Sequence, residues 1–418
     1  MSLDSIASIT MPKVLKGNVV LPLSKSECNR LLIIGALTGL HDQLPEISDA
    51  NDSQRLLALL NKCKGKGDDS VYDCGPAGTT MRFLTAYFST LSGTRVLTGS
   101  SRMLKRPLGI LVDALRQLGA QIKYLGEEGF APIEVTGANL KGGQIELDGS
   151  VSSQFVTALV LIAPTLHNGL VIRFKGPVAS MPYIIMTLRI MERFHVLGIW
   201  SGDTLSVSNQ NYLVDDAVKQ FTVETDWSAA SYCYALAAIA DEADIFMEGL
   251  RENSLQGDSV CALVFPFLGV STTYENGGAR ITKNHYAPIS FGFDFEDCPD
   301  VVQTCAVVAA AKKIPLLMRG LNTLRLKETD RIQALVTELK KLGVGCSEPG
   351  KGILEINSFN GQTENDVVIE TYEDHRMAMA FAPLAILNPG LQMRETNVVV
   401  KSWPKFWDEL KKLGAVIS

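Results

Sequence analysis

Residues 228–240 read SAASYCYALAAIA, a polar start that leads into apolar, mostly alanine positions. Five other stretches of the 418-residue chain begin with small polar or charged residues and continue in the same way. The intervals between the six are 53, 74, 75, 72 and 75 residues, which indicates one supersecondary repeat present six times. Because the stretches are apolar almost all round, we expect buried helices. Their first residues are Ser26, Thr79, Ser153, Ser228, Asp300 and His375.

A second signal recurs inside the repeats, where a helix-like stretch ends in Leu-Gly. Glycine just past the last apolar position is typical of a helix C-terminus. Four of the five copies are followed by a strand, a turn and another strand, so each repeat is predicted to be β-α-β-α-β-β, with parallel and antiparallel pairing mixed. The copies are Leu118-Gly119, Leu197-Gly198, Leu268-Gly269, Leu342-Gly343 and Leu413-Gly414.

The first repeat is predicted to be truncated. Its Leu-Gly analogue falls near Lys66-Gly67, and Gly78 follows only eleven residues later, so most of the hairpin is missing. A chain of this length is expected to form two domains, each an α/β domain of three repeats with sheets outside and helices inside. The main boundary is placed near residues 222–226, and residues 1–20 could pair with either domain.

Composition narrows the class of partner. The net charge is −6, with 46% of residues hydrophobic and 20% charged, as in a compact globular protein. Such a chain lacks the basic face that broad nucleic-acid binding needs. Local basic residues in an acidic chain instead indicate a focused pocket for a small anion.

The sequence carries no pattern for a metal site, a disulfide framework or a membrane anchor. Its eight cysteines form no CxxC pair, and its five histidines lie far apart. The apolar runs stop well short of a membrane span, and no signal peptide is recognised. We therefore expect a soluble, cytoplasmic protein that binds no metal, no nucleic acid and no membrane.

Basic and polar side chains stand at or just inside the starts of the six stretches. A helix N-terminus offers free N–H groups and the positive end of a dipole, so it favours anions. Each start taken alone is more typical of an ordinary capped core helix. The repetition and the basic residues favour a site for a substrate with more than one anionic group. The side chains are Lys25, Arg30, Arg82, Gln154, Asp300 and Arg376.

Two segments combine a helix start with groups suited to an anion. PLSKSECNR places Lys25, Ser26 and Arg30 around one helix start, where they can hold a phosphate or carboxylate. GPAGTTMR, at residues 75–82, is a glycine-rich turn into a helix, without the Rossmann or P-loop fingerprint. A cationic loop, SSRMLKRP, and the hydroxyls near Ser153 and Ser180 could add contacts. Solvated turns and ordinary caps are the alternatives.

LRLKETDR, at residues 324–331, is the densest candidate. If a helix begins near Thr329, Glu328 is a carboxylate flanked by cations and placed for proton transfer. Asp300 is a second carboxylate, and two such groups could divide proton-transfer roles. A charged helix start with i,i+3 pairing is the alternative.

In this order, the motifs resemble the enolpyruvyl transferase family and, within it, the EPSP synthases. The resemblance covers nearly the whole chain, and its segments are PLSKSECNR, GPAGTTMR, SSRMLKRP, GSVSSQF, PDVVQT, LRLKETDR, YEDHRMAM and VVVKSWP. It implies two inside-out α/β barrel-like domains of three repeats each, with buried central helices and an active site in the cleft between them. The implied domains are residues 21–223 and residues 1–20 plus 224–418.

The implied activity is transfer of the enolpyruvyl group of phosphoenolpyruvate to the 5-hydroxyl of shikimate 3-phosphate, on the route to chorismate. It needs no cofactor, and glyphosate is the family's inhibitor. By matched position, Asp300 would accept the hydroxyl proton and Glu328 would protonate the methylene carbon, with Lys25 as a third catalytic residue. The implied shikimate 3-phosphate ligands are Lys25, Ser26, Arg30, Ser152, Ser153, Gln154, Ser180, Asp300, Thr323 and Lys327. The implied phosphoenolpyruvate ligands are Lys25, Gly78, Arg102, Gln154, Arg331, Arg376 and Lys401.

Three positions depart from the family pattern. Pro76 and Phe83 replace the usual Asn and Pro at the glycine-rich turn, and Thr323 stands where an Asn is expected. We expect the first two to change the affinity for phosphoenolpyruvate and for glyphosate, and the third to alter a contact with the sugar ring. A monomer is expected.

Two alternatives stay open. UDP-N-acetylglucosamine enolpyruvyl transferase shares the fold and the donor, but it uses a loop cysteine that SSRMLKRP lacks. A non-catalytic protein that binds small anions or RNA ends on the same fold is opposed by the acidic charge and by the presence of both Asp300 and Glu328.

Overall fold

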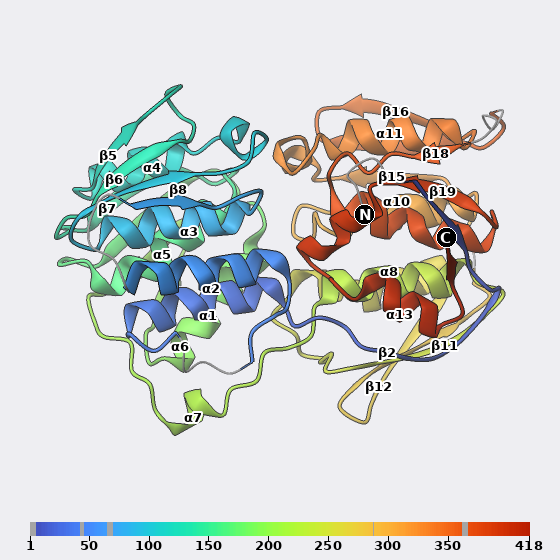
Figure 1. The fold of residues 1–418 in the computed structure, drawn as a ribbon, viewed down its shortest axis with the longest axis horizontal. Helices are drawn as coiled ribbons and strands as arrows, with labels where there is room; N and C mark the ends of the chain where they lie inside the picture. The colour runs from blue at the N-terminus through green and yellow to red at the C-terminus, as the bar shows by residue number, and fades with distance from the viewer. Residues whose placement is uncertain (1–5, 42–45, 65–69, 287, 362–366) are drawn as a thin grey trace. The chain divides into compact units, whose positions relative to one another are not determined.

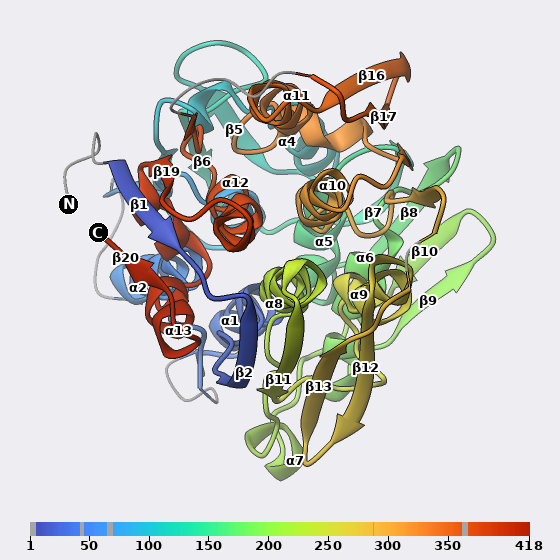
Figure 2. The same cartoon turned by 90° about the vertical axis from the view of Figure 1, so that its right-hand side faces the viewer.

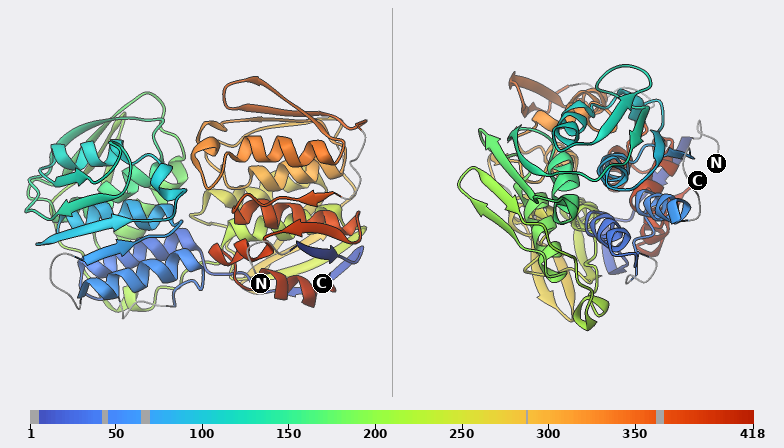
Figure 3. Two further views of the ribbon diagram at one scale, coloured as in Figure 1. Left: turned by 45° about the horizontal axis from the view of Figure 1, so that its top comes forward. Right: turned by 90° about the vertical axis from the view of Figure 1, so that its left-hand side faces the viewer.

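The computed structural model describes residues 6–41, 46–64, 70–286, 288–361 and 367–418 (Figure 1). The chain divides into two compact units, each of which is seen from further sides in Figure 3. The N-terminal unit consists of Ser24–Ser48 and Asp52–Val223. The C-terminal unit consists of Met1–Leu23, Asp49–Asn51 and Glu224–Ser418.

The N-terminal unit contains two complete copies of the predicted repeat. In each copy the first two strands are parallel, and the closing hairpin pairs antiparallel with the second strand. The predicted mixture of pairings is therefore confirmed. The first copy is β3 (Ser70–Asp73), α3 (Gly78–Ser89), β4 (Thr94–Thr98), α4 (Gly109–Gln117), β5 (Gln121–Tyr124) and β6 (Ile133–Thr136). The second is β7 (Gly143–Asp148), α5 (Ser153–Ile162), β8 (Leu170–Lys175), α6 (Met181–Arg193), β9 (Gly198–Ser201) and β10 (Thr204–Val207), with α7 (Asp216–Lys219) after it.

The C-terminal unit contains three four-stranded sheets, two of which are completed by the start of the chain. β2 (Val14–Val19) pairs in parallel with β11 (Glu242–Glu248), and β1 (Ile6–Thr10) lies antiparallel between β19 (Leu391–Arg394) and β20 (Val416–Ile417). The other elements of this unit are α8 (Trp227–Ile239), α9 (Cys261–Val264), β12 (Val270–Glu275), β13 (Gly278–Lys283), β14 (Phe291–Asp294), α10 (Val302–Ala311), β15 (Leu316–Arg319), α11 (Arg331–Lys341), β16 (Gly345–Gly350), β17 (Ile353–Ser358), β18 (Val368–Ile369), α12 (His375–Phe381) and α13 (Phe406–Lys412).

The first repeat is truncated further than predicted. It keeps α1 (Lys25–Leu37) and α2 (Asn51–Lys64) but has no strand of its own among the described residues. The strand ahead of α1 is β2, which pairs in the C-terminal unit instead, so the described chain forms five sheets. The helix end predicted near Lys66-Gly67 lies outside the described residues.

The six helices predicted from the repeat are buried. In the N-terminal unit α1, α3 and α5 contact one another. In the C-terminal unit α8, α10 and α12 do so, and Figure 2 shows these three helices side by side. Every residue of α8 except Ser228 is buried. Each sheet is hydrogen bonded separately within the described residues, so the inside-out barrel stays a prediction. No helix in the described ranges is long and apolar enough to cross a membrane.

Four of the five Leu-Gly pairs end a helix as predicted, with the glycine at positive φ. The pair Leu197-Gly198 was predicted wrongly. α6 ends at Arg193, and His195 takes the left-handed conformation with φ 63°. Gly198 begins β9 instead, where a Cβ atom would lie 2.4 Å from Leu188 Cδ2. The glycine is therefore needed for the close approach of strand and helix, not for a cap.

At Gly137 the backbone of the N-terminal unit packs too closely to leave room for a side chain. A Cβ atom there would lie 1.2 Å from the Leu91 carbonyl oxygen, which is backbone and cannot swing away. We expect Gly137→Ala to lower stability by about 2 kcal/mol or more, as overpacking does. The matched control is Gly126→Ala, because the nearest atom there is Pro132 Cδ at 3.7 Å. Thermal unfolding of both variants checks this, and equal melting temperatures would contradict it.

Candidate active site

The starts of four helices meet in the C-terminal unit. Arg376, the second residue of α12, donates from Nη1 to Tyr232 Oη at 3.2 Å and from Nη2 to Ser228 Oγ at 3.3 Å, both on α8. Its Nη2 also donates to Asp300, just ahead of α10, at 2.8 Å. Arg331, the first residue of α11, donates to Asp300 as well, at 2.9 Å. The predicted gathering of polar helix starts therefore occurs within this unit.

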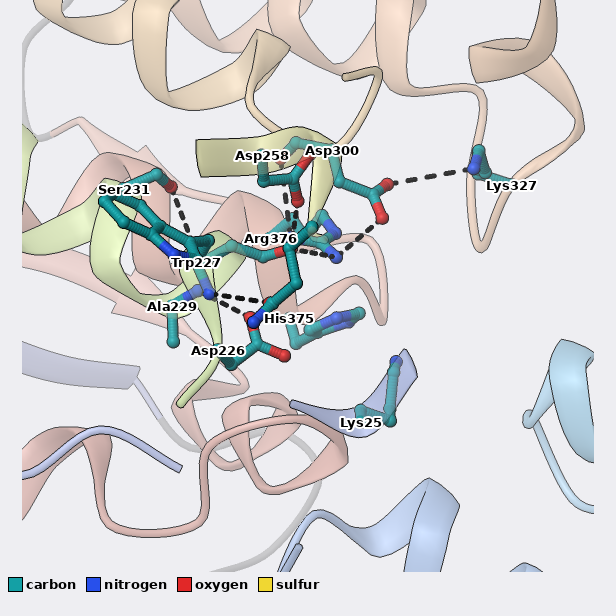
Figure 4. Close-up of polar contacts among 12 residues, drawn as sticks. Lys25, Asp226, Trp227, Ala229, Ser231, Asp258, Asp300, Lys327, His375 and Arg376 are labelled. Atoms are coloured by element: carbon teal, nitrogen blue, oxygen red, sulfur yellow. Dashed lines mark hydrogen bonds and ion pairs between the residues drawn. The ribbon is translucent and has the colours of Figure 1, made fainter. Parts of the chain in front are cut away.

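Asp300 is the centre of this cluster (Figure 4). Arg331 approaches Oδ1 at 2.9 Å, Arg376 approaches Oδ2 at 2.8 Å, and Lys327 Nζ lies 3.7 Å from Oδ1. Burial disfavours the charged form, but Arg376, Lys327 and Arg331 more than offset it and hold the pKa of Asp300 well below its usual range. Asp300 is therefore an ionised carboxylate at neutral pH.

Arg331 carries the densest set of contacts. Its side chain is 1% exposed, and Nε donates to Asp374 Oδ2 at 2.7 Å while Nη2 donates to Glu328 Oε2 at 2.9 Å. Burial opposes the charged form of Arg331, yet Asp374, Glu328 and Asp300 together raise its pKa above the usual value. One buried guanidinium thus connects three carboxylates from three segments of the chain.

Glu328 lies between two cations. Its Oε2 accepts from Arg331, and its Oε1 lies 2.9 Å from Nζ of Lys401, which ends the 3₁₀ helix Thr396–Lys401. Lys327 is the remaining cation, and its burial lowers its pKa although Asp300 opposes the shift. Cations and carboxylates are thus nearly balanced in this cluster.

α11 begins two residues later than predicted. The predicted start was near Thr329, but the helix starts at Arg331 because Asp330 caps it, its side chain accepting from the Gln333 N–H at 3.1 Å. Lys327 and Glu328 therefore lie in the loop ahead of the helix, as expected. Thr323 lies in the 3₁₀ helix Asn322–Leu326, and its side chain makes no hydrogen bond with any described residue.

Asp258 and Asp374 belong to the cluster but were not predicted as site residues. Ser228 Oγ donates to Asp258 in a very short hydrogen bond and accepts from Arg376, so it links the two. Burial, reinforced by Asp300, raises the pKa of Asp258 to about 7. Asp374 is fully buried and caps α12. Asp374 could have been predicted, because it stands two residues before Arg376 in the sequence. Nothing in Gln256-Gly257-Asp258 indicated that Asp258 belongs to the site.

In the N-terminal unit, Asp52 links the starts of three helices. Lys25 Nζ lies 3.0 Å from Asp52 Oδ2, and Thr80 Oγ1 of α3 donates to the Asp52 carbonyl at 3.3 Å. Lys25, the first residue of α1, is thereby fixed beside α2 and α3. Asp52 was not predicted either, because an acidic residue in the first turn of a helix is ordinary.

Arg30 ties α1 to α5 and α6. Its guanidinium donates to Thr187 Oγ1 at 2.8 Å, to the Tyr183 carbonyl at 2.9 Å and to Thr157 Oγ1 at 3.3 Å. Burial lowers its pKa to about 10. Most of its donors are thus taken by protein acceptors, and its implied part in holding shikimate 3-phosphate stays a prediction.

The remaining predicted residues of this unit also stand at helix starts. Ser152 caps α5 and accepts from the Gln154 N–H at 3.4 Å, and Ser153 is buried next to it. Ser180 is the N-cap residue of α6 and takes the left-handed conformation, with φ 55°, without a side-chain capping bond. Gly78 begins α3, and Arg102 is half-buried ahead of the 3₁₀ helix Met103–Lys105. Among the described residues, no group of three or more His, Cys, Asp or Glu could hold a metal ion.

Comparison with known proteins decides the family. The sequence model described as EPSP synthase (3-phosphoshikimate 1-carboxyvinyltransferase) matches residues 9–410. The chain belongs to the EPSP synthase family. A Bacteroides fragilis protein named 3-phosphoshikimate 1-carboxyvinyltransferase is 45% identical over 409 residues, which are 97% of this chain and 97% of that one. A Photobacterium profundum protein of the same name is 34% identical over 97% of this chain and 99% of its own. The family predicted from the motifs is therefore confirmed.

Solved structures agree on the fold. EPSP synthase from Acinetobacter baumannii matches 99% of this chain and 100% of its own with a TM-score of 0.75 at 23% identity. The enolpyruvyl transferase NikO from Streptomyces tendae matches 99% of both chains with a TM-score of 0.71 at 14% identity. At such identities the likeness shows a shared mixed α/β fold and no more.

Asp258 gives a prediction for stability against pH. Its folded pKa of about 7 lies above the ordinary value of 3.8, so the folded protein binds this proton more tightly than the unfolded chain does. The resulting stabilisation is full below the ordinary value and is lost as the pH rises through about 7. Asp258→Asn cannot ionise, so its melting temperature relative to wild type should rise between about pH 5 and about pH 8.

The matched control for this experiment is Asp408→Asn, because Asp408 is 71% exposed in the same unit. Its difference from wild type should stay constant over the same pH range. A difference between Asp258→Asn and wild type that does not change with pH would show that Asp258 titrates normally.

Proposed function

We propose that this protein transfers the enolpyruvyl group of phosphoenolpyruvate to the 5-hydroxyl of shikimate 3-phosphate and releases phosphate. The single observation that carries the proposal is the 45% identity, over 97% of both chains, to a protein named for that reaction. The cluster around Asp300 supports it, because Lys327, Arg331, Arg376 and Lys401 surround two carboxylates suited to proton transfer.

Each unit would bring one part of the binding site. The C-terminal unit would hold phosphoenolpyruvate with Arg331, Arg376 and Lys401 and shikimate 3-phosphate with Asp300, Lys327 and Thr323. The N-terminal unit would contribute its helix starts, with Lys25 and Gln154 contacting both substrates. Two polyanions repel each other, and fixed cations offset that repulsion. The residues proposed from the N-terminal unit are Lys25, Ser26, Arg30, Gly78, Arg102, Ser152, Ser153, Gln154 and Ser180.

Closure of the two domains around the substrates would exclude water from the reaction. Lys and Arg side chains supply the positive charge in this proposal, and no cofactor is invoked. We propose a monomer that acts in the cytoplasm on these two small molecules.

Asp300 would accept the proton of the attacking hydroxyl. A carboxylate that contacts three cations is a weak base, so Asp300 must first lose some of these contacts. The substrate anions would break them, because a phosphate or carboxylate at Arg376 or Lys327 competes with Asp300 for the same donors. The hydroxyl oxygen then bonds to C2 of phosphoenolpyruvate while its proton passes to Asp300.

Glu328 would supply a proton to C3, giving a tetrahedral intermediate. Both Glu328 oxygens are engaged by cations, so one contact must be released before the group carries a proton. An anion at Lys401 would release Oε1. The C2–O bond to phosphate then breaks, Glu328 takes a proton back from C3, and the departing phosphate takes the proton that Asp300 holds. The enolpyruvyl ether and phosphate leave, Asp300 is again ionised, and Glu328 again carries a proton, as it did before it acted on C3.

The direct test is phosphate release by the purified protein with phosphoenolpyruvate and either shikimate 3-phosphate or UDP-N-acetylglucosamine. We expect release with shikimate 3-phosphate alone. Release with the sugar nucleotide alone would assign the protein to the other enolpyruvyl transferase. Release with neither acceptor would overturn the proposed activity and leave the non-catalytic alternative.

Glu328→Gln separates catalysis from binding. The amide cannot deliver or regain a proton at C3, so turnover should fall on the order of 10²–10⁴-fold. Binding of shikimate 3-phosphate, measured by calorimetry, should persist. The control is Glu348→Gln, which removes the exposed partner of Arg325 in the same unit. Turnover like that of the control would exclude Glu328 from proton transfer.

Pro76 should change the anion affinity of the glycine-rich turn. Proline has no backbone N–H, so Pro76 gives the turn one donor fewer than an Asn there would. We expect Pro76→Asn to tighten phosphoenolpyruvate and glyphosate binding by about 2- to 10-fold, the value of one hydrogen bond. Steady-state inhibition by glyphosate measures this, and equal inhibition constants for wild type and variant would contradict it.

A further inference from the structure

Arg106 is a buried arginine that no described residue engages through its side chain. It lies in the SSRMLKRP loop and is 6% exposed. Its Nε is buried without a hydrogen-bond partner, and its guanidinium makes no ion pair or hydrogen bond with any residue that the structure describes. Burying such a group unpaired is costly, because it loses water and gains no acceptor. A ligand that accepts hydrogen bonds would remove that cost.

The guanidinium of Arg106 lies directly over Gly78. A Cβ atom on Gly78 would be 2.6 Å from Arg106 Nη1 and 2.8 Å from Nη2, so only glycine leaves room for the approach. Gly78 is the first residue of α3, a helix of 12 residues whose N-cap, Ala77, offers no side-chain acceptor. The Arg106 guanidinium therefore lies beside the first residue of α3, and the N-cap of that helix leaves its first-turn N–H groups without a side-chain acceptor.

Arg82, a neighbouring buried arginine, is used differently. It donates to the carbonyls of Gly78 and Pro107, at 3.2 and 3.0 Å, and to Met103 Sδ at 3.2 Å. These bonds fasten the loop that carries Arg106 to the start of α3. Arg82 thus fixes the loop against the start of α3, whereas the donors of Arg106 remain available to a ligand.

We infer that Arg106 is a further phosphate-binding residue, which would contact the phosphate group of phosphoenolpyruvate beside the first turn of α3. The inference rests on the proposed function for the identity of the ligand. A helix N-terminus favours a phosphate, and a guanidinium matches its oxygens in a fork. Arg106 adds a cation to the set implied by the family resemblance, in which Arg102 alone represents this loop.

Steady-state kinetics of Arg106→Gln and Arg106→Lys test this contact. Loss of one charge-assisted contact should raise KM for phosphoenolpyruvate on the order of 10- to 100-fold in Arg106→Gln. KM for shikimate 3-phosphate should change by less than about threefold. Arg106→Lys, which keeps the charge but not the fork, should recover part of the affinity. An unchanged KM for phosphoenolpyruvate in Arg106→Gln would overturn the inference.

The matched control is Arg95→Gln. Arg95 is buried in the same unit, but its Nη1 donates to the Ser92 carbonyl at 2.9 Å, and its guanidinium lies over the Phe88 ring. It should lose stability without a selective change in KM. If Arg106→Gln behaves like Arg95→Gln, Arg106 is structural and does not bind phosphate.

A second measurement does not depend on turnover. Inorganic phosphate at constant ionic strength should raise the melting temperature of wild type more than that of Arg106→Gln. Equal phosphate-dependent shifts would overturn the inference whether or not the protein is active. If wild type releases no phosphate from its substrates but keeps the larger shift, the proposed function fails and phosphate binding by Arg106 stands.

A double-mutant cycle joins Arg106 to Gly78. Gly78→Ala would push the guanidinium aside, since the atom it meets is the end of a flexible side chain. If both residues act through one phosphate contact, the effects of Gly78→Ala and Arg106→Gln on KM for phosphoenolpyruvate should not add. Full additivity would show that they act separately and would contradict the inference.

Discussion

The guanidinium of Arg331 is the group on which the rest of the C-terminal site depends. It is 1% exposed and contacts Asp300 ahead of α10, Glu328 ahead of α11 and Asp374 at the start of α12. Without it, three carboxylates would face one another in a largely dry setting, which costs several kcal/mol for each unpaired charge. A buried ion pair is weak evidence of stability, but this one fixes where three helix starts lie relative to one another.

The repeat explains why polar groups collect at helix starts. Each of the six helices predicted from the repeat (α1, α3, α5, α8, α10 and α12) is buried on all sides. Such a helix can carry polar side chains only where it begins, and there its N–H groups need acceptors. Four of these six helices have a side-chain cap, from Ser24, Ser152, Asp226 and Asp374. α3 and α10 have none. These two starts lie beside Arg106 and Asp300, the places where the proposals locate anion binding and proton transfer.

Much of the fold could be read from the sequence because its signals are local. Apolar stretches at a fixed interval identified six buried helices, and glycine after leucine identified four helix ends. The pairing of β2 with β11 could not be read, since it joins residues more than two hundred positions apart and residues 14–19 resemble any short strand. Among the described residues the first repeat has no strand of its own, since the strand ahead of α1 pairs in the C-terminal unit, whereas the sequence had predicted only a shortened hairpin.

The residues of the candidate site likewise divide into those with a local sequence signal and those recognised only in the fold. Residues in dense motifs, such as Lys327, Glu328 and Arg331, were found because several charges stand close together in the chain. Asp52 and Asp258 were missed because each has an ordinary neighbourhood in sequence and is distinguished only by contacts across the fold. Arg106 lies in the SSRMLKRP loop that the sequence singled out, but the sequence did not distinguish it from the other cations of that loop. For Arg106 the informative fact is the lack of a partner in a buried place, and no sequence pattern reports that.

The cations around Asp300 and the Arg106 guanidinium differ in their partners, and the difference fits the proposed reaction. In the C-terminal unit the cations are paired with carboxylates, so an incoming anion must compete and gains less binding energy. Each displaced carboxylate then loses a stabilising charge, and its affinity for a proton rises. Asp300 and Glu328 would thus become effective in proton transfer only once the substrates are bound. Part of the binding energy of the substrates would then lower the barrier of the chemical step. No carboxylate among the described residues pairs with Arg106, so an anion there would gain the full interaction and serve binding alone. Arg106 would thus only hold the donor, whereas the cations around Asp300 and Glu328 would both hold it and make these carboxylates better bases.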